Sequence, residues 1–246
     1  MKTKRIISLL VAFIAYISFS YAQVTSEAQS LYNQGLKLKE ERKVTEALEK
    51  FKQALSINAN YTDALYQAGW CQNELKNYYS AIDYLRKARE VWSVIPKVYF
   101  ELGYAFEKSG SIDSAIKCYT RCLDLKPDYA NASKQLGHIE FNQGDYENAL
   151  AHFTRYESDY TSEIRDYMYW YRKGYMQNAH KEYSNAKTSL QKSLTYKADY
   201  FNTFLELGFA ATKLNQDEEA IGYFKKAMEI DPKNHVPING IAEVYR

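Results

Sequence analysis

From residue 28 onwards, apolar side chains recur every three or four residues in short segments separated by polar turns. This spacing places the apolar side chains on one face of a helix. In one clear pair of segments, Tyr99, Leu102 and Phe106 are followed, after a polar turn, by Ala115 and Tyr119. The pattern therefore predicts an all-α fold built from short amphipathic helices packed in pairs.

Small residues recur within this pattern at a fixed interval of 34 residues, interrupted once by three additional residues. The recurring glycines are Gly35, Gly69, Gly103, Gly137, Gly174 and Gly208, and an alanine follows each of them twelve residues later: Ala47, Ala81, Ala115, Ala149, Ala186 and Ala220. Two small residues that keep a 34-residue period indicate a repeated helix pair. If the glycine is numbered position 8, we expect the small residues at positions 8, 20 and 27 to let the two helices approach closely.

The best-preserved repeats carry a further set of residues at fixed positions. The third has Tyr99, Leu102-Gly103, Phe106, Ala115, Tyr119 and Pro127, and the sixth has Phe204, Leu207-Gly208, Ala220, Phe224 and Pro232. These residues resemble the tetratricopeptide repeat (TPR) pattern. The resemblance implies an α-solenoid, a right-handed superhelix of antiparallel helix pairs that builds a binding surface.

The register divides the chain into consecutive segments. After a lead at 23–27, we expect six repeats at 28–61, 62–95, 96–129, 130–166, 167–200 and 201–234, and a single helix at 235–246. We expect this last helix to cap the sixth repeat; the alternative is that the natural chain continues. The three additional residues fall around Tyr160 to Asp166. We interpret them as a longer first helix in the fifth repeat, capped by the hydroxyl of Thr161 or Ser162.

The first residues are typical of a secretory signal. Lys2, Lys4 and Arg5 precede an apolar stretch over 6–19, and a short motif of small residues ends at Ala22. The apolar stretch is shorter than the roughly 18 residues of a membrane span. We therefore predict a cleaved signal peptide at 1–22 and a periplasmic or secreted protein, with an uncleaved membrane anchor as the alternative. No cysteine lies near the predicted cleavage point, so we do not expect a lipid anchor.

Charge and cysteine content narrow the classes of partner. Without residues 1–22 the chain has 29 Lys and Arg against 30 Asp and Glu. This near-neutral balance predicts neither nucleic-acid binding nor membrane insertion of the mature chain. The cysteines Cys71, Cys118 and Cys122 are odd in number and match no disulfide framework, so we expect them to be small buried residues.

Catalytic and metal-binding motifs are not evident in the sequence. The histidines are scattered and lack the spacing of a metal site on a helix: His138, His152, His180 and His235. There is no Gly-rich phosphate loop and no nucleophile elbow. We therefore expect a non-enzymatic protein that uses no cofactor and no metal.

The resemblance implies that positions 2, 5, 9, 12 and 13 of each first helix face the inside of the superhelix. Positions 5 and 9 lie one turn apart and form a stripe, which is mostly aromatic here. The repeat does not need an aromatic residue at position 9 for its own packing, so our first candidates for partner contacts are Trp70, Tyr104, Tyr175 and Phe209. The other candidates on the stripe are Tyr66, Phe100, Tyr171, Lys134 and His138. Exposed aromatic groups of this kind supply much of the energy at interfaces.

Amide side chains flank this stripe: Asn73, Asn131, Asn142 and Asn178. An amide both donates and accepts, which suits a peptide backbone or a sugar hydroxyl. Lys97, Lys134 and Arg172 predict a mildly basic region in the middle of the groove. In related chaperone adaptors, lysine and asparagine at positions 5 and 9 clamp a carboxylate; here the first repeat has Tyr32 and Leu36, so we expect no such clamp.

The sequence thus predicts a protein–protein interaction scaffold of the cell envelope that binds a peptide or helix of a partner protein in an aromatic groove. Two alternatives remain. One is binding of an envelope polysaccharide or peptidoglycan by the same aromatic and amide side chains. The other is a structural role through self-association.

Overall fold

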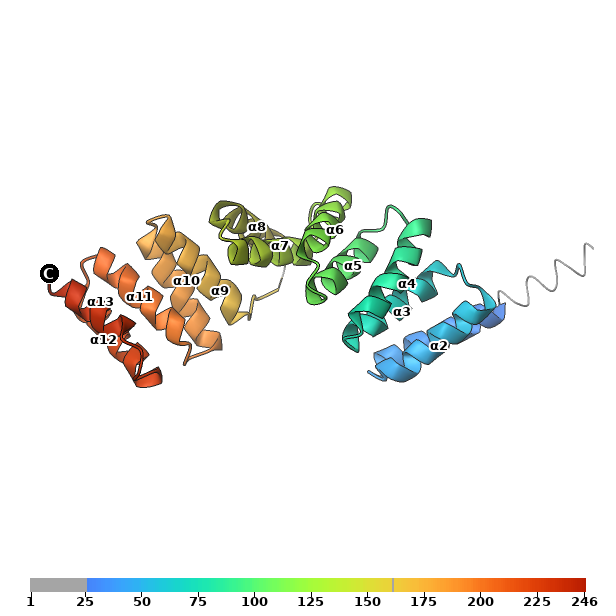
Figure 1. The fold of residues 1–246 in the computed structure, drawn as a ribbon, viewed down its shortest axis with the longest axis horizontal. Helices are drawn as coiled ribbons and strands as arrows, with labels where there is room; N and C mark the ends of the chain where they lie inside the picture. The colour runs from blue at the N-terminus through green and yellow to red at the C-terminus, as the bar shows by residue number, and fades with distance from the viewer. Residues whose placement is uncertain (1–25, 161) are drawn as a thin grey trace, which may run out of the picture. The chain divides into compact units, whose positions relative to one another are not determined.

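The computed structural model describes residues 26–160 and 162–246, and in this part every regular element is an α-helix (Figure 1). The predicted all-α fold is confirmed. The predicted signal peptide at 1–22, most of the predicted lead segment and Thr161 lie outside the described residues. The chain divides into two compact units, one ending at Pro127 and the other beginning at Asp128.

Within the first unit, the described residues form three helix pairs. Residues 26–40 are helical and precede α2 (Val44–Ile57). The next two pairs are α3 (Thr62–Glu74) with α4 (Tyr78–Val91), and α5 (Pro96–Lys108) with α6 (Ile112–Leu125).

The described part of the second unit forms three more pairs and a final helix. These are α7 (Ala130–Gln143) with α8 (Tyr146–Asp159), α9 (Tyr167–Ala179) with α10 (Tyr183–Tyr196), and α11 (Phe201–Lys213) with α12 (Asp217–Ile230), followed by α13 (Val236–Val244). From the second repeat to the sixth, the first helix begins at the residue where the sequence pattern places the start of the repeat.

The two helices of each pair meet at the position-8 glycine. A Cβ atom on Gly103 would lie 2.8 Å from the Tyr119 ring, and one on Gly174 would lie 2.5 Å from Cγ of Leu190. No side chain fits in that space, so the period of the glycine reflects the close approach of the two helices. The alanine twelve residues later is completely buried in all six repeats.

The turn between the two helices of a pair contains one left-handed residue in every repeat. Gly110 and Gly144 have φ angles of 85° and 82°. The other four repeats place a larger residue there: Arg42, Lys76, Lys181 and Asn215. Glycine tolerates this conformation best, because other residues place Cβ close to the backbone.

The prediction of a longer first helix in the fifth repeat is wrong. Helix α9 has 13 residues, as α11 does, and the three additional residues lie in the connection from α8 to α9. Asp166 caps α9 in place of Ser162, because its carboxylate accepts hydrogen bonds from the backbone N–H groups of Met168 (3.0 Å) and Tyr169 (3.2 Å).

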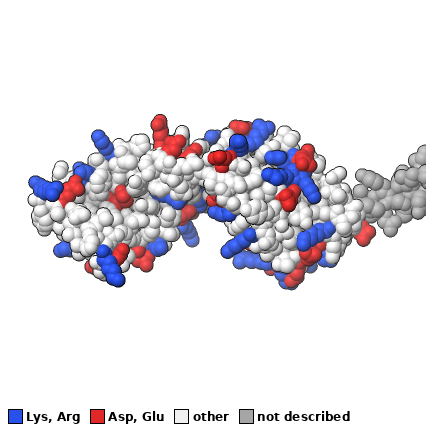
Figure 2. Space-filling model, in the orientation of Figure 1, with Lys and Arg blue, Asp and Glu red and all other residues white. Residues whose placement is uncertain are grey.

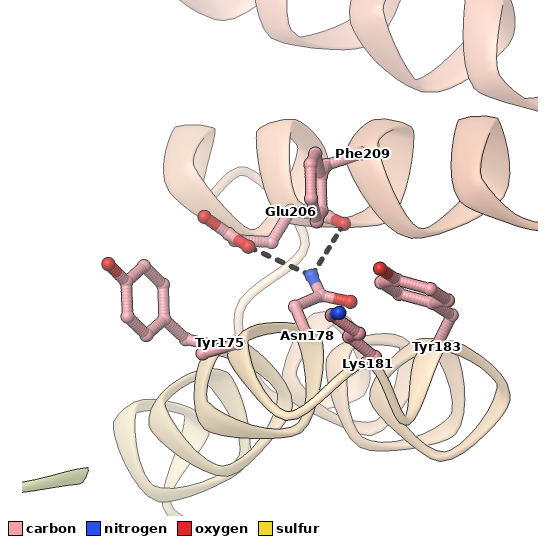
Figure 3. A pocket seen from close by; sticks show the side chains of 7 residues that line it. Tyr175, Asn178, Lys181, Tyr183, Glu206 and Phe209 are labelled. Carbon is pink, nitrogen blue, oxygen red and sulfur yellow. Dashed lines mark hydrogen bonds between the residues drawn. The ribbon is translucent and has the colours of Figure 1, made fainter.

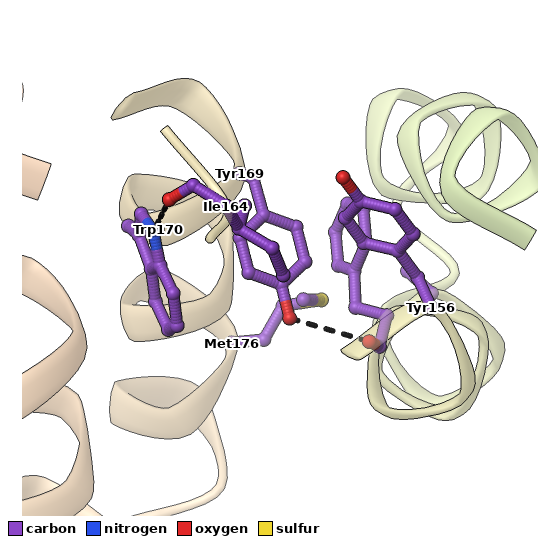
Figure 4. Packing of buried hydrophobic residues seen from close by; sticks show 7 residues of the cluster. Tyr156, Ile164, Tyr169, Trp170 and Met176 are labelled. Carbon is purple, nitrogen blue, oxygen red and sulfur yellow. Dashed lines mark hydrogen bonds between the residues drawn. The ribbon is translucent and has the colours of Figure 1, made fainter. Parts of the chain in front are cut away.

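The connection is held against α9 by a buried aromatic cluster (Figure 4). The Trp170 indole N–H donates to the backbone carbonyl of Ile164 at 2.8 Å, and the Tyr169 hydroxyl donates to the carbonyl of Phe153 at 3.2 Å. The rings of Tyr169 and Trp170 lie 4.9 Å apart, nearly perpendicular. The insertion thus contributes to the core of the second unit.

The prediction for the cysteines is confirmed, since Cys71, Cys118 and Cys122 are free and buried. Burial raises the pKa of the Cys71 and Cys122 thiols to about 12 and that of Cys118 to about 11. Among the described helices, none is both long enough and apolar enough to span a bilayer. Acidic and basic side chains are interspersed on the face of each unit drawn in Figure 2.

Candidate functional site

A pocket of about 370 Å³ opens in the second unit (Figure 3). Its lining comes from α9, α11, the turn after α9 and the start of α10: Tyr175, Asn178, Ala179, Lys181, Tyr183, Glu206 and Phe209. Two of the four position-9 aromatic residues, Tyr175 and Phe209, therefore lie in one pocket, together with one of the four amides.

Three aromatic rings surround this pocket. The ring centroids of Tyr183 and Phe209 lie 6.1 Å apart at 73°, an edge-to-face arrangement. Phe209 is 38% exposed. Tyr175 lies on the other side of Asn178 (Figure 3), and its ring is 5.5 Å from that of Tyr146. A hydrogen bond with Tyr146, together with burial, raises the pKa of Tyr175 to about 12.

The floor of the pocket is polar. Nδ2 of Asn178 donates to the backbone carbonyl of Glu206 at 3.0 Å and to its carboxylate at 2.8 Å. Burial raises the pKa of the Glu206 carboxyl, and the hydrogen bond from Asn178 lowers it by less. Oδ1 of Asn178 is buried and has no hydrogen-bond partner among the described residues.

The expectation that Asn73 and Asn178 present open amides to a partner is wrong. Both side chains are buried, with 3% and 4% of their surface exposed. The physical reason is that the side chain at position 12 of one repeat packs against position 6 of the next repeat, and in both cases the residue at position 6 is a glutamate that accepts its hydrogen bonds. Asn73 donates to the carbonyl of Glu101 at 3.0 Å and to its carboxylate at 2.9 Å.

The sequence analysis did not select the position-6 glutamates, Glu101 and Glu206, or the position-17 tyrosines, Tyr78 and Tyr183. The rings of Tyr78 and Tyr104 in the first unit lie 6.3 Å apart at 75°, much as Tyr183 and Phe209 do in the second. A signal was present in the sequence, because asparagine at position 12, tyrosine at position 17 and glutamate at position 6 of the next repeat occur together twice. These occurrences join repeats two and three, and repeats five and six.

The remaining aromatic candidates are partly buried and contact other side chains of their own unit. Nζ of Lys97 lies 4.5 Å from the centre of the Tyr66 ring. Phe100 lies 5.7 Å from Tyr119. Tyr171 lies 6.3 Å from Tyr175, ring to ring. They stand beside the position-9 residues, as the stripe predicts.

The polar candidates of α7 lie outside the residues that line the pocket. Lys134 forms an ion pair with Asp166 at 2.8 Å, so its charge is compensated inside the unit. His138 contacts the guanidinium of Arg172, which also donates to Oδ1 of Asn142 at 3.2 Å. Asn131 is exposed. The predicted basic region therefore contains charges that already have partners.

Comparison with known proteins identifies the repeat. Tetratricopeptide repeat models match residues 63–92, 96–129 and 202–234. The chain is a tetratricopeptide repeat protein. The matched segments are the second, third and sixth repeats of the register found in the sequence.

The curated relatives are much longer than this tetratricopeptide chain. Anaphase-promoting complex subunit 3 of Schizosaccharomyces pombe is 32% identical over 29% of this chain, and the match covers 11% of the relative. Superkiller complex protein 3 of Mus musculus is 24% identical over 80% of this chain, and the match covers 13% of that protein.

Solved structures show the same tetratricopeptide fold. The chain is similar to pilF of Pseudomonas aeruginosa, with a TM-score of 0.68, 14% identity, and coverage of 90% of this chain and 99% of the other. It is also similar to YrrB, a TPR protein with an unusual peptide-binding site, with a TM-score of 0.59, 19% identity, and coverage of 76% and 94%.

Metal-ligating side chains are not clustered in the part of the chain that the structure describes. Within residues 26–160 and 162–246, no three His, Cys, Asp or Glu side chains are placed to hold a metal ion. The pocket offers aromatic faces, one carboxylate and one buried carbonyl acceptor.

Replacing Glu206 with glutamine is expected to stabilise the protein at pH 7. Because burial raises the pKa of this carboxyl above its unfolded value, its ionised form opposes folding, and stability falls as the pH rises from the unfolded pKa towards the folded one. Glutamine keeps an acceptor for Asn178 and removes the charge. Thermal melts should show a higher Tm for E206Q at pH 7 and no difference below about pH 4, near the unfolded pKa.

The exposed Glu218 on α12 provides the matched control, E218Q, for which we expect no comparable change of Tm with pH. A lower Tm for E206Q at pH 7, or an advantage that persists at pH 3, would contradict the assignment of Glu206 as a buried, destabilising charge.

Proposed function

We propose that this protein is a non-enzymatic scaffold that binds a peptide segment or helix of a partner protein, with the Tyr175–Phe209 pocket as a principal contact. One observation carries the proposal: position-9 aromatic residues from two successive first helices, α9 and α11, line a single open pocket. Stacked helix pairs build binding surfaces of this kind. The similarity to YrrB, which has a peptide-binding site, supports the same class of ligand.

The size and lining of the pocket suit the side chain of a peptide. Its volume of about 370 Å³ lies at the lower end of the range of ligand pockets, about 300–1,000 Å³. Aromatic rings give a large contact area, and a few polar groups on the floor orient what enters. An extended segment that places one side chain in the pocket could continue along the first helices of its unit.

We also propose that the protein acts in the cell envelope, on the basis of the signal peptide predicted at 1–22. Amino-terminal sequencing of the exported protein should then begin at Gln23. Recovery of the intact chain with Met1 in the cytoplasmic fraction would remove this part of the proposal.

The binding proposal is tested with the double variant Tyr175→Ala and Phe209→Ala. Peptides selected from a random display library on the intact chain should lose at least about tenfold in affinity, since burying one aromatic side chain contributes about 1.5–3 kcal/mol and each 1.4 kcal/mol is a factor of about ten. The helical circular dichroism spectrum should not change.

Tyr79→Ala is the matched control, because Tyr79 is 77% exposed and lies in the first unit. Equal peptide affinity in the double variant and the wild type would rule out the pocket as the binding site. Calorimetric heat from peptidoglycan fragments, with none from any selected peptide, would assign the pocket to sugars.

A further inference from the structure

The aromatic pocket of the second unit has a counterpart in the first unit, built from the same repeat positions. Its rings are Trp70, Tyr78 and Tyr104, in the places of Tyr175, Tyr183 and Phe209. Its polar pair is Asn73 with Glu101, in the place of Asn178 with Glu206. The two sites differ in one respect that concerns charge.

In the first unit, a lysine of the chain itself occupies the site. Nζ of Lys39, from position 12 of the first repeat, lies 3.7 Å from the centre of the Trp70 ring. It also donates to Oε1 of Gln67 at 2.9 Å. Burial lowers the pKa of Lys39 and raises that of Glu101, and the charges of these two residues oppose both shifts. The ammonium group of Lys39 therefore lies against the aromatic face, and the charge of Lys39 favours the ionised form of Glu101.

In the second unit, the position that corresponds to Lys39 is occupied by Phe141, at position 12 of the fourth repeat. The Phe141 ring lies 5.4 Å from that of Tyr175, edge to face, and brings no charge. No ion pair within the described residues includes Glu206 or its counterpart Glu101, so the two sites differ in the cation that lies against the aromatic rings. A buried carboxylate is ordinarily paired with a cation.

The other groups of the second-unit pocket do not supply the missing charge. Lys181 borders the pocket from the turn after α9, but no ion pair within the described residues joins it to Glu206. Lys213 lies over Phe209, with Nζ 5.3 Å from the ring centre, and is paired with Glu243 at 3.1 Å. The buried Oδ1 of Asn178, like that of Asn73 in the first unit, accepts no hydrogen bond from the described residues. A positively charged hydrogen-bond donor would complete this site.

We propose that the second-unit pocket binds a basic side chain, lysine or arginine, of the partner peptide. Its charged end lies among Tyr175, Tyr183 and Phe209 and against the Glu206 carboxylate, in the way that Lys39 lies over Trp70 in the first unit. Aromatic faces attract cations through the negative charge of the ring face, and the carboxylate excludes acidic residues. The inference rests on the proposed peptide-binding function and specifies the residue that is recognised.

The test uses the intact chain and a matched pair of small probes. Nα-acetyl-lysinamide carries the basic side chain, and Nα-acetyl-norleucinamide has a similar alkyl chain without the charge. In an NMR titration, we expect saturable shifts of the Tyr183 and Phe209 ring signals with the lysine probe, and affinity at least about fivefold weaker for the norleucine probe. Equal affinities, or no saturable shift with the lysine probe up to ~50 mM, would overturn the proposal.

Glu206→Gln separates charge from shape. We expect E206Q to weaken binding of the lysine probe at least about fivefold, because the carboxylate supplies the charge, and to leave binding of the norleucine probe unchanged. Glu218→Gln, at an exposed position of α12 outside the pocket lining, should not weaken binding of the lysine probe. Unchanged lysine affinity in E206Q would remove Glu206 from the site and contradict the inference.

A second variant tests the correspondence between the two units. Lys39→Met removes the internal cation and keeps the length of the side chain, so the lysine probe should gain a second binding equivalent, seen as a change in Trp70 fluorescence. A correctly folded K39M variant that still binds one equivalent would contradict the assignment of Lys39 as an internal occupant. If K39M unfolds the first unit, the inference is still decided by the titration of the intact wild-type chain, followed at the Tyr183 and Phe209 signals of the second unit.

The peptides selected on the intact chain distinguish this inference from the proposed function. Selected peptides that share a lysine or arginine, and lose affinity in the Y175A/F209A variant, support both. Peptides that depend on Tyr175 and Phe209 but share no basic residue would leave the scaffold function standing and overturn the inference.

Discussion

Trp170→Ala is expected to destabilise the second unit by about 3–5 kcal/mol, a large part of the 5–15 kcal/mol typical of a folded domain. Trp170 is 4% exposed and packs in the cluster between α8, α9 and their connection (Figure 4). Alanine would leave a cavity and would remove the donor to the buried carbonyl of Ile164. The ring would also cease to support Nζ of Lys192, which lies 3.9 Å from its centre.

Urea denaturation followed by circular dichroism measures this effect. Trp92→Ala is the control, because Trp92 is only partly buried in the first unit and its loss should cost less. Trp170→Phe should fall between wild type and alanine, since it keeps much of the apolar area and loses the hydrogen bond. If W170A and W92A have equal urea midpoints, the insertion does not contribute to the core as described.

Gly208→Ala and Gly222→Ala are expected to change stability in opposite directions. A Cβ on Gly208 would lie 2.5 Å from the Phe224 ring, and such overpacking costs about 1–3 kcal/mol. A Cβ on Gly222, within α12, would meet nothing within 4 Å. There alanine should stabilise by about 0.5–1 kcal/mol, because glycine loses more backbone freedom in a helix.

Both variants make the same chemical change in adjacent helices of the same repeat, so the sign of the effect isolates packing from helix propensity. Thermal melts at one pH suffice to compare the two variants with the wild type. A gain of stability in G208A would show that α11 and α12 separate easily, and would contradict the packing reason for the glycine period.

The Glu206 carboxylate is expected to lower the stability of the second unit while it serves the proposed binding of a cation. The buried charge of Glu206 opposes folding, and glutamine is expected to stabilise the protein while weakening its hold on a cation. Stability lost at a binding site is a recurrent feature of functional surfaces. In the first unit Nζ of Lys39 lies over the Trp70 ring, whereas the uncharged Phe141 stands at the corresponding position of the second unit, and the proposed preference for a basic side chain rests on this difference.

The sequence by itself determined where the helices lie. The first helices begin at Thr62, Pro96, Ala130, Tyr167 and Phe201, at the starts that the glycine period defines. This was predictable because Gly103 or Gly208 must face one particular side chain of its own helix pair, a contact that a short stretch of chain specifies. Burial of Cys71, Cys118 and Cys122 was predictable for another reason, because free cysteine behaves as a small hydrophobic residue.

Only the tertiary structure decided what each candidate side chain does. Helical periodicity selected Tyr175 and Phe209, but their shared pocket depends on how α9 packs against α11. The Asn178 amide is hydrogen-bonded to Glu206 of the next repeat, 28 residues away. Lys39, from the first repeat, lies over the Trp70 ring of the second. Within a repeat, each position has fixed surroundings, whereas between repeats its surroundings depend on whichever residue the neighbouring repeat presents. The fold therefore follows from the 34-residue period, whereas the candidate site depends on which side chains neighbouring repeats bring together.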